Sequence, residues 1–163
     1  MKDLVYLLPI VVACILVWFT YLIVNYVATV IKTKKKDDTM VCGVNSTGKV
    51  FYSIITVVYL VSFIYTMYYI ITNLLAGNVD NIYLPLNILT IGSFVYYYCL
   101  QLIIFFGQRQ VLIGRVIFDY RKIKRVTYPK ARKLRFTYGQ KTLETNTTFI
   151  DDSLLKKSLQ RSR

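Results

Sequence analysis

The sequence predicts a membrane α+β protein: a bundle of three transmembrane helices followed by a small antiparallel β-sheet module with a C-terminal amphipathic helix. Three observations lead to this fold class. The 163-residue chain holds three stretches without a charged side chain, at positions 4–31, 50–79 and 81–108. Its formal net charge of +13 is concentrated in residues 107–163, which contain 15 Lys or Arg and four acids. Beyond residue 109, apolar and polar residues alternate along two segments.

The uncharged stretches are long enough to cross a bilayer. A hydrocarbon core of about 30 Å needs roughly 20 apolar residues in a helix that rises 1.5 Å per residue. We expect transmembrane helices at about 4–31, 50–75 and 84–106, which form a first domain at 1–106. A cleaved signal peptide would have a small-residue cleavage site after its apolar stretch, but lysines follow the first apolar stretch here. We therefore expect this stretch to be retained as a transmembrane helix.

The distribution of lysines predicts the orientation. The loop 32–49 carries five lysines, among them Lys32, Lys34, Lys35 and Lys36, whereas the loop 76–87 carries no positive charge. Short loops rich in Lys and Arg stay on the cytoplasmic side. The expected topology therefore has the N-terminus outside and a basic second domain, 107–163, in the cytoplasm.

Each predicted span carries a stripe of uncharged polar and aromatic side chains. In the second span the stripe recurs every three or four residues, which is the spacing of one helix face. Such residues favour close helix packing, so we expect the stripes to face one another; a polar path through an oligomer is the alternative. The stripes are Cys14, Trp18, Tyr21, Asn25 and Thr29; Tyr59, Ser62, Thr66, Tyr69 and Asn73; and Asn87, Thr90, Ser93, Tyr97 and Gln101.

A run of three tyrosines, Tyr96 to Tyr98, lies near the middle of the third span. Three adjacent phenol groups point in three directions, so at least one hydroxyl is expected to meet another helix or a partner chain. The residues expected at a contact with a membrane-protein partner or a second copy are Tyr59, Tyr69, Tyr96, Tyr97, Tyr98 and Gln101.

The second domain alternates with a period of two, as strands with one buried face do. Val116, Phe118 and Tyr120 form one such series, and Leu134, Phe136 and Tyr138 form another. Gly114, residues 129–131 and residues 139–140 mark turns, and a further strand is expected at about 141–150. Asp151, Asp152 and Ser153 supply caps for a helix at about 153–161 that stacks Leu154, Leu155, Ser158 and Leu159 on one side.

Four short segments lie in the last third of the chain: Val116-Ile117-Phe118-Asp119-Tyr120, Ile123-Lys124-Arg125-Val126, Lys133-Leu134-Arg135-Phe136 and 154–159. Together they resemble the YcxB-like and pleckstrin-homology-like C-terminal domains of bacterial membrane proteins. The resemblance implies a bacterial plasma (inner) membrane protein whose cytoplasmic module is not catalytic. Some relatives of this architecture accompany membrane-active bacteriocins as self-protection proteins.

Eight Lys or Arg and no acid lie between positions 121 and 135. Just under the inner leaflet, each could gain about 1 kcal/mol from anionic lipid. We expect them to dock on anionic lipid or on a partner. The simpler interpretation is that they reflect only the positive-inside bias and solubility. Binding to nucleic acid is disfavoured, because tethering to the membrane restricts access to it. They are Arg121, Lys122, Lys124, Arg125, Lys130, Arg132, Lys133 and Arg135.

Little in the sequence predicts catalysis. The chain has no histidine, which excludes Ser–His and Cys–His pairs and the common metal sites. Gly43 to Lys49 fits most of a phosphate-binding loop, but Val50 stands where Ser or Thr would hold Mg²⁺. Asp119 is expected to form a strand-end ion pair with Arg115 and Arg121. We expect no catalytic residue, no metal and no cofactor.

Together these patterns predict a non-enzymatic integral membrane accessory protein. Its expected role is immunity against, or regulation of, another membrane polypeptide, with the basic module docked on anionic lipid or on that partner. The alternative is a subunit of an oligomeric channel or transporter, whose polar stripes would line a path. A third interpretation, an enzyme, would depend on Asp119.

Overall fold

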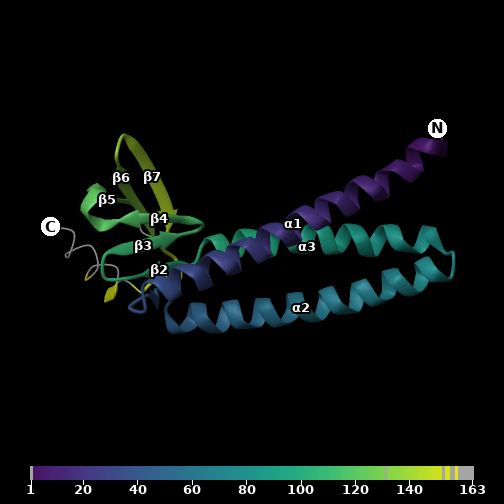
Figure 1. The fold of residues 1–163 in the computed structure, drawn as a ribbon, viewed down its shortest axis with the longest axis horizontal. Helices are drawn as coiled ribbons and strands as arrows, with labels where there is room; N and C mark the ends of the chain where they lie inside the picture. Colours follow the sequence, from purple (N-terminus) through teal and green to yellow (C-terminus); the bar gives the residue numbers. More distant parts are fainter. Residues whose placement is uncertain (1, 131, 152, 155–156, 158–163) are drawn as a thin grey trace. The chain divides into compact units, whose positions relative to one another are not determined.

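The computed structural model describes residues 2–130, 132–151, 153–154 and 157. Figure 1 shows three helices and two antiparallel sheets, an α+β chain. The chain divides into two compact units: a helical unit, Met1–Asn25 with Tyr52–Tyr98, and a strand unit, Tyr26–Phe51 with Cys99–Arg163. The elements are α1 (Lys2–Lys36), β1 (Val41–Cys42), α2 (Ser46–Leu75), η1 (Val79–Ile82), α3 (Tyr83–Gln101), β2 (Ile104–Phe106), β3 (Gln110–Ile113), β4 (Val116–Asp119), η2 (Tyr120–Lys122), β5 (Ile123–Lys130), β6 (Lys133–Tyr138) and β7 (Lys141–Asn146).

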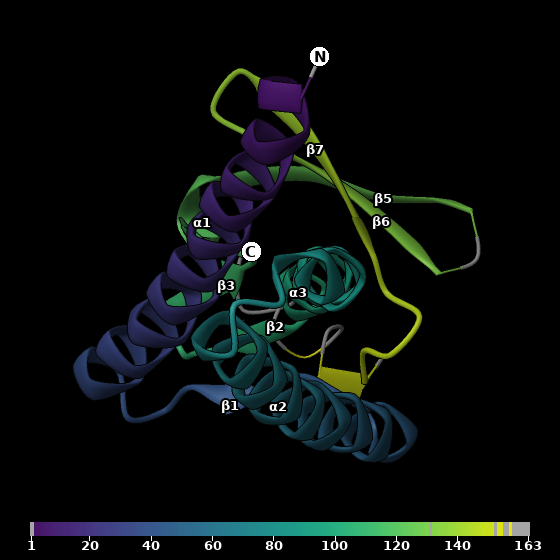
Figure 2. The same ribbon diagram turned by 90° about the vertical axis from the view of Figure 1, so that its right-hand side faces the viewer.

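In the helical unit, α2 and α3 lie side by side in both views of the ribbon (Figures 1 and 2). Gly77, with a φ of 75°, follows the C-terminus of α2 and reverses the chain, a position at which glycine avoids the strain of a side chain. A small apolar cluster joins the three helices of the unit: Leu16 from α1, Phe63, Met67 and Ile70 from α2, and Leu86 and Leu89 from α3.

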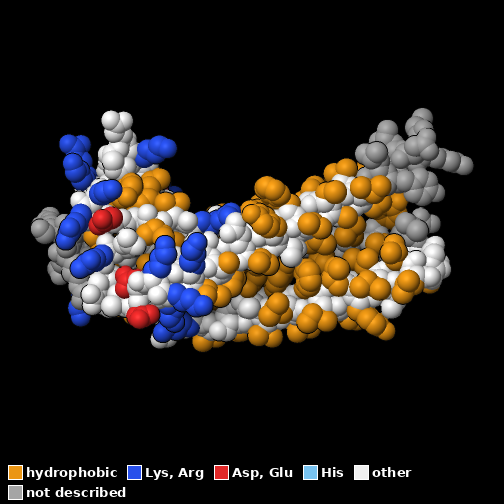
Figure 3. Space-filling model, viewed as in Figure 1, with side chains coloured by type: hydrophobic (Ala, Val, Ile, Leu, Met, Phe, Trp, Pro, Cys, Tyr) orange, Lys and Arg blue, Asp and Glu red, His pale blue; other side chains and the backbone are white. Residues whose placement is uncertain are grey.

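The outward-facing surface of these helices is apolar. Hydrophobic side chains cover much of the visible helical surface in Figure 3, and many of them belong to α2. Leu8–Lys36 and Ser46–Leu75 are long and apolar enough to cross a membrane, and the most apolar windows of these helices are only 11% and 0% buried. A helix in the core of a soluble protein is mostly buried, so this exposure suggests association with a membrane.

The strand unit contains two antiparallel sheets, with strand orders β1-β2-β3-β4 and β5-β6-β7. Phe105 lies between Cys42 on β1 and Leu112 on β3 in the ladder of the first sheet. In the second sheet, Phe136 pairs with Leu143. The turns that follow β3 and β6 contain Gly114 (φ 60°) and Gly139 (φ 62°), as the sequence predicted.

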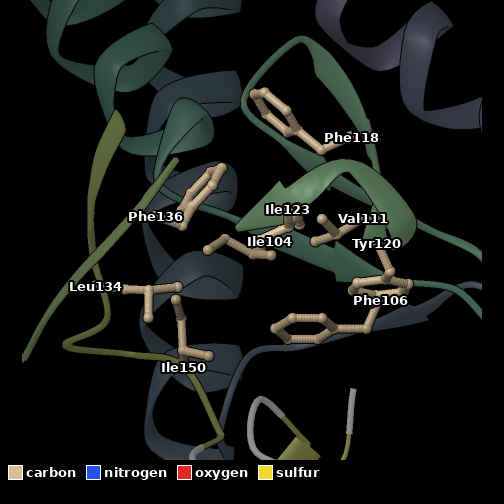
Figure 4. Packing of buried hydrophobic residues seen from close by; sticks show 9 residues of the cluster. All are labelled: Ile104, Phe106, Val111, Phe118, Tyr120, Ile123, Leu134, Phe136 and Ile150. Atoms are coloured by element: carbon tan, nitrogen blue, oxygen red, sulfur yellow. The ribbon is translucent and has the colours of Figure 1, made fainter. Parts of the chain in front are cut away.

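The core of the strand unit draws residues from both sheets. Figure 4 shows the side chains of Phe118, Phe136 and Ile104 among nine that make up this cluster. Phe118 and Phe136 meet edge to face, with ring centroids 5.4 Å apart. The nine residues are Ile104, Phe106, Val111, Phe118, Tyr120, Ile123, Leu134, Phe136 and Ile150.

Several element boundaries differ from those expected from sequence. The loop 32–49 contains β1, and the expected third span, 84–106, ends at Gln101 and is followed by β2. The two-residue β1 has too little length to show a period, and the apolar triplet of β2 matches a buried helix as well as a strand. The alternating segments form two sheets instead of one, and the strand expected at 141–150 ends at Asn146.

The expected C-terminal helix lies largely outside the described residues. Ser153, Leu154 and Lys157 are helical. Leu155, Ser158 and Leu159 belong to the part of the prediction that falls outside the described residues, as does Asp152.

Candidate functional site

Polar side chains of α2 and α3 hydrogen-bond to one another. The Tyr59 hydroxyl lies 3.0 Å from the Ser93 hydroxyl, and the Tyr96 hydroxyl donates to Thr56 Oγ1 at 3.2 Å. The rings of Tyr59 and Tyr96 are stacked, with centroids 4.2 Å apart and planes within 13°. Ser93 is fully buried and Tyr96 is 8% exposed. These polar groups therefore join the two helices, as hydroxyl-bearing residues do in membrane bundles.

The stripe expected on the first helix does not join this contact. Trp18 and Tyr21 are 61% and 57% exposed, and their rings contact each other. In the helical unit, α1 instead uses Leu16 for the apolar cluster and Phe19 for edge contact with Phe94. The expectation that all three stripes face one another is wrong for Cys14, Trp18 and Tyr21 of α1, which are exposed, whereas Asn25 and Thr29 of the same stripe are half-buried.

The residues expected at an intramembrane partner contact occupy different environments. Tyr59 and Tyr96 are engaged within the chain, and Tyr97 lies against Phe19 with ring centroids 6.4 Å apart. Tyr69 and Gln101 are half-buried, whereas Tyr98 is 59% exposed. Of the expected set, Tyr98 is therefore the residue whose side chain faces most openly away from the chain.

Two tyrosines that the sequence analysis did not single out are more exposed. Tyr65 and Tyr68 on α2 are 69% and 68% exposed, and within the described part of the chain their hydroxyls make no hydrogen bond. At 100° per residue, they lie about 150° around the helix from the face that carries Phe63, Met67 and Ile70. A helical-wheel count centred on that apolar contact face could have found them. The outer face of α2, defined here by Tyr65 and Tyr68, thus combines exposure with unused hydroxyl groups.

In the strand unit, the eight predicted basic residues lie on η2, β5, β6 and the turn between these strands, and all eight are exposed. We call β5, β6 and their turn the basic hairpin; it is the long arm labelled β5 and β6 in Figure 2. Lys130 and Lys133 face each other across the ladder. Figure 3 shows Lys and Arg side chains gathered over the strands.

One of the eight cations is paired. The Arg135 guanidinium forms an ion pair with Glu144 on the neighbouring strand β7, and Arg135 Nε donates to Glu144 Oε1 at 2.6 Å. Elsewhere on the basic hairpin most of β5 is exposed on both faces, and Tyr128 is 52% exposed. The surface combines cations with an amphipathic aromatic side chain, a composition suited to a membrane interface.

The segment that fits most of a phosphate-binding loop has a structural explanation. Asn45 Oδ1 accepts a hydrogen bond from the Gly48 backbone N–H at 2.7 Å and thereby caps the N-terminus of α2. A Cβ at Gly43 would lie 2.2 Å from the Phe106 ring, and one at Gly48 would lie 2.4 Å from Val44 Cγ1. Both glycines are therefore required by packing. Asn45 N–H also donates to the Phe149 carbonyl.

Two carboxylates of the strand unit, Asp119 and Asp151, have local structural partners. Asp119 Oδ1 accepts from the Arg121 backbone N–H at 3.0 Å and thereby caps η2, and its expected ion pair with Arg115 and Arg121 stays a prediction. Asp151 accepts from the Ser153 hydroxyl at 2.6 Å and the Ser153 N–H at 2.9 Å, and the first of these bonds is the largest cause that lowers the pKa of Asp151. Among the described residues, no group of three Cys, Asp or Glu side chains is placed to hold a metal ion.

Comparisons with protein-family models, with curated proteins and with solved structures found no match.

Proposed function

We propose that this chain is a non-enzymatic accessory protein of a bacterial inner membrane, which binds another membrane-inserted polypeptide through the outer face of α2. In this proposal α1, α2 and α3 all cross the bilayer, with the start of α1 outside and the strand unit in the cytoplasm. The lysines that end α1, Lys34 to Lys36, support the orientation, since Lys and Arg near the ends of spans remain inside.

The observation that carries the proposal is the pair of unused hydroxyls on α2. If the apolar stretch 50–75 spans the bilayer, Tyr65 and Tyr68 lie about 4 and 8 Å from its midpoint, well within a core of about 30 Å. A phenol hydroxyl in hydrocarbon lacks a hydrogen-bond partner, and a neighbouring helix supplies one. A membrane polypeptide packed on this face would satisfy both groups.

The basic hairpin gives the second part of the proposal. Its exposed cations would lie under an anionic leaflet, where each contributes about 1 kcal/mol if it reaches the surface. Six of the eight predicted cations lie on this hairpin, and the ion pair with Glu144 makes Arg135 the weakest contributor among them. The role we propose for this docking is to hold the strand unit at the membrane, beside the cytoplasmic end of the bound polypeptide.

The specific role that we favour is immunity against, or regulation of, a membrane-active polypeptide. Two antiparallel sheets around one core, followed by helical residues at 153–154, support the further proposal that the strand unit is a pleckstrin-homology-like module. The alternative of a channel or transporter subunit is less favoured, because Tyr59, Ser93 and Tyr96 already bond across the α2–α3 contact where a path would need free polar groups.

Site-specific photo-crosslinking in native membranes tests the partner. A photoreactive amino acid at position 65 or 68 is expected to capture one defined membrane polypeptide, identified by mass spectrometry. Placed at Leu60, which is 51% exposed but lies about 140° around the helix from Tyr65 and about 80° from Tyr68, it should capture mainly lipid. With the photoreactive group kept at position 68, replacing Tyr65 by Phe should lower the yield several-fold, because an interhelical hydrogen bond contributes about 0.6–1.7 kcal/mol.

The substitution Tyr59→Phe is the matched control. It also removes one phenol hydroxyl from α2, but from the face that contacts Ser93, so partner capture at position 68 should persist. Equal yields at positions 60, 65 and 68 would contradict the proposal. Recovery of only the chain itself, as a defined oligomer, would favour the channel or transporter subunit.

A further inference from the structure

A pocket in the strand unit lies where the end of α1 and its following loop meet the β2–β3 turn. Its volume is about 400 Å³, and its lining residues are Lys36, Asp37, Gln108, Arg109 and Gln110. We propose that this pocket binds the phosphodiester group of one anionic phospholipid. The site is separate from the basic hairpin and from the outer face of α2.

The side chains around the pocket suit a phosphate group. Lys36 and Arg109 are exposed, and neither forms an ion pair with a carboxylate of the described residues. Arg presents a planar fork of N–H donors that matches phosphate oxygens, Lys adds a point charge, and the amides of Gln108 and Gln110 add neutral donors. The lining thus has an excess of positive charge and of hydrogen-bond donors.

The single acid of the pocket is engaged with its own loop. Asp37 Oδ1 accepts a hydrogen bond from the Thr39 backbone N–H at 3.1 Å and a further one from the Thr39 hydroxyl. A carboxylate that accepts local donors presents less negative charge to an incoming anion. We therefore expect Asp37 to stabilise the loop conformation and to repel a phosphate group only weakly.

The turn that carries Arg109 is fixed against this loop. The Gln108 N–H donates to Thr39 Oγ1 at 3.1 Å, and the Gly107 N–H donates to the Gln110 carbonyl at 2.9 Å. A Cβ on Gly107 would lie 2.5 Å from Asp37 Oδ2, so the close approach of loop and turn requires glycine there. Binding groups held in place by such contacts lose less entropy on binding.

The position of Lys36 along α1 selects a lipid as the source of the phosphate. The apolar part of α1 ends at Ile31, and Lys36 lies five residues later, about 7 Å further along the helix. The headgroup layer on each side of the hydrocarbon core is about 5–8 Å thick. Lys36 therefore reaches the depth of lipid phosphates, provided that α1 spans the membrane as proposed above; the inference rests on that part of the proposed function.

Native mass spectrometry of the full-length protein tests the site. The protein is released from nanodiscs of phosphatidylcholine that contain a titrated fraction of phosphatidylglycerol, and retained lipids are counted. The wild-type chain is expected to keep one phosphatidylglycerol. The double variant Lys36→Ala, Arg109→Ala should need about 30-fold more of this lipid for the same occupancy, because two surface cations are lost.

The matched control is Lys49→Ala, Lys141→Ala, which removes the same charge from exposed positions outside both the pocket and the basic hairpin. It should keep the retained lipid, since neither lysine lines the pocket and diffuse attraction by surface charges is screened by salt. An equal loss in both variants would overturn the inference in favour of diffuse electrostatic attraction. No retained phosphatidylglycerol in the wild-type chain would also overturn it.

Soluble glycerol phosphate distinguishes the two sources of a phosphate group. At concentrations equal to that of the accessible lipid, it is expected to leave the retained phosphatidylglycerol in place. If it displaces the lipid at equal concentration, the site takes a free phosphate compound and the lipid assignment is wrong. Failure of the proposed membrane topology is detected separately, by labelling single cysteines at positions 78 and 140 in intact cells, so the two failures are distinguishable.

Discussion

Replacing Phe136 by alanine is expected to lower the free energy of unfolding of the strand unit by about 3–5 kcal/mol. Phe136 on β6 is 2% exposed and meets Phe118 from the other sheet edge to face. Removing its ring leaves a cavity between the two sheets and deletes the aromatic contact. Domains of this size are stable by only about 5–15 kcal/mol, so a loss of this magnitude threatens the fold of the unit.

Hydrogen exchange read by mass spectrometry measures this effect on the purified protein, because it reports the strands independently of the helices. Amides of β3 and β6 should lose much of their protection in the Phe136→Ala variant. The control is Val116→Ala on β4, a position that is 54% exposed, where a change within about 0.5 kcal/mol is expected. Unchanged protection in the Phe136 variant would show that the sheets do not share the core described here.

The second large effect is expected at Gly43, between β1 and α2. Gly43→Ala should lower the stability of the strand unit by about 2–3 kcal/mol, because the new Cβ would lie 2.2 Å from the Phe106 ring. That ring is 6% exposed and lies within the core, so it has little room to move. The Gly43 carbonyl accepts a hydrogen bond from the Asp151 N–H, and the Gly43 N–H donates to the Ile104 carbonyl. A shift of Gly43 therefore also weakens these two backbone hydrogen bonds.

Gly92 in α3 provides the matched control, since the same added Cβ would meet nothing within 4 Å. Gly92→Ala should be neutral or slightly stabilising, as expected for glycine replaced by alanine in a helix. Hydrogen exchange of β1, β2 and the 149–151 segment distinguishes the two variants. A Gly43→Ala protein with unaltered protection would contradict the packing account of the glycine-rich segment and reopen its interpretation as a ligand loop.

The positions of the three helices could be predicted from the uncharged stretches of the sequence. Gaps in charge predict apolar helices because membrane spans exclude ionised groups, and the structure has a helix in each gap. Residues 32–36, four of which are lysines, were expected in a loop but continue α1 to Lys36, since lysine is a good helix former. Their charge indicates which side of a membrane they face and does not indicate where the helix ends.

The strand unit shows where local sequence patterns are insufficient. The alternation around Phe118 and Phe136 predicted β4 and β6, because a half-buried strand repeats every two residues. The pairing of β1 with β2 could not be predicted in this way, since it joins short segments that lie far apart along the chain. The pocket of Lys36 and Arg109 depends on the same long-range fold.

The candidate surfaces were predictable to different extents. All eight predicted cations between positions 121 and 135 are exposed, as expected for charged side chains. The pairing of Arg135 with Glu144 depends on the β6–β7 register, which the sequence does not reveal. On α2, spacing placed Tyr59 on a polar face. Which tyrosines face a neighbouring helix is decided by the apolar contacts of the bundle, and that information is absent from a single helix.

The proposed function depends on three crossings of the membrane, and the accessibility of single cysteines measures whether α3 makes the third. Asn78→Cys in the α2–α3 connection and Gln140→Cys in the β6–β7 turn would be introduced at exposed positions, with Cys14, Cys42 and Cys99 replaced by alanine. In intact cells, a membrane-impermeant maleimide should label position 78 at once and position 140 only after permeabilisation. Labelling of both positions from outside would mean that α3 does not cross the membrane, and would contradict the proposed cytoplasmic location of the strand unit.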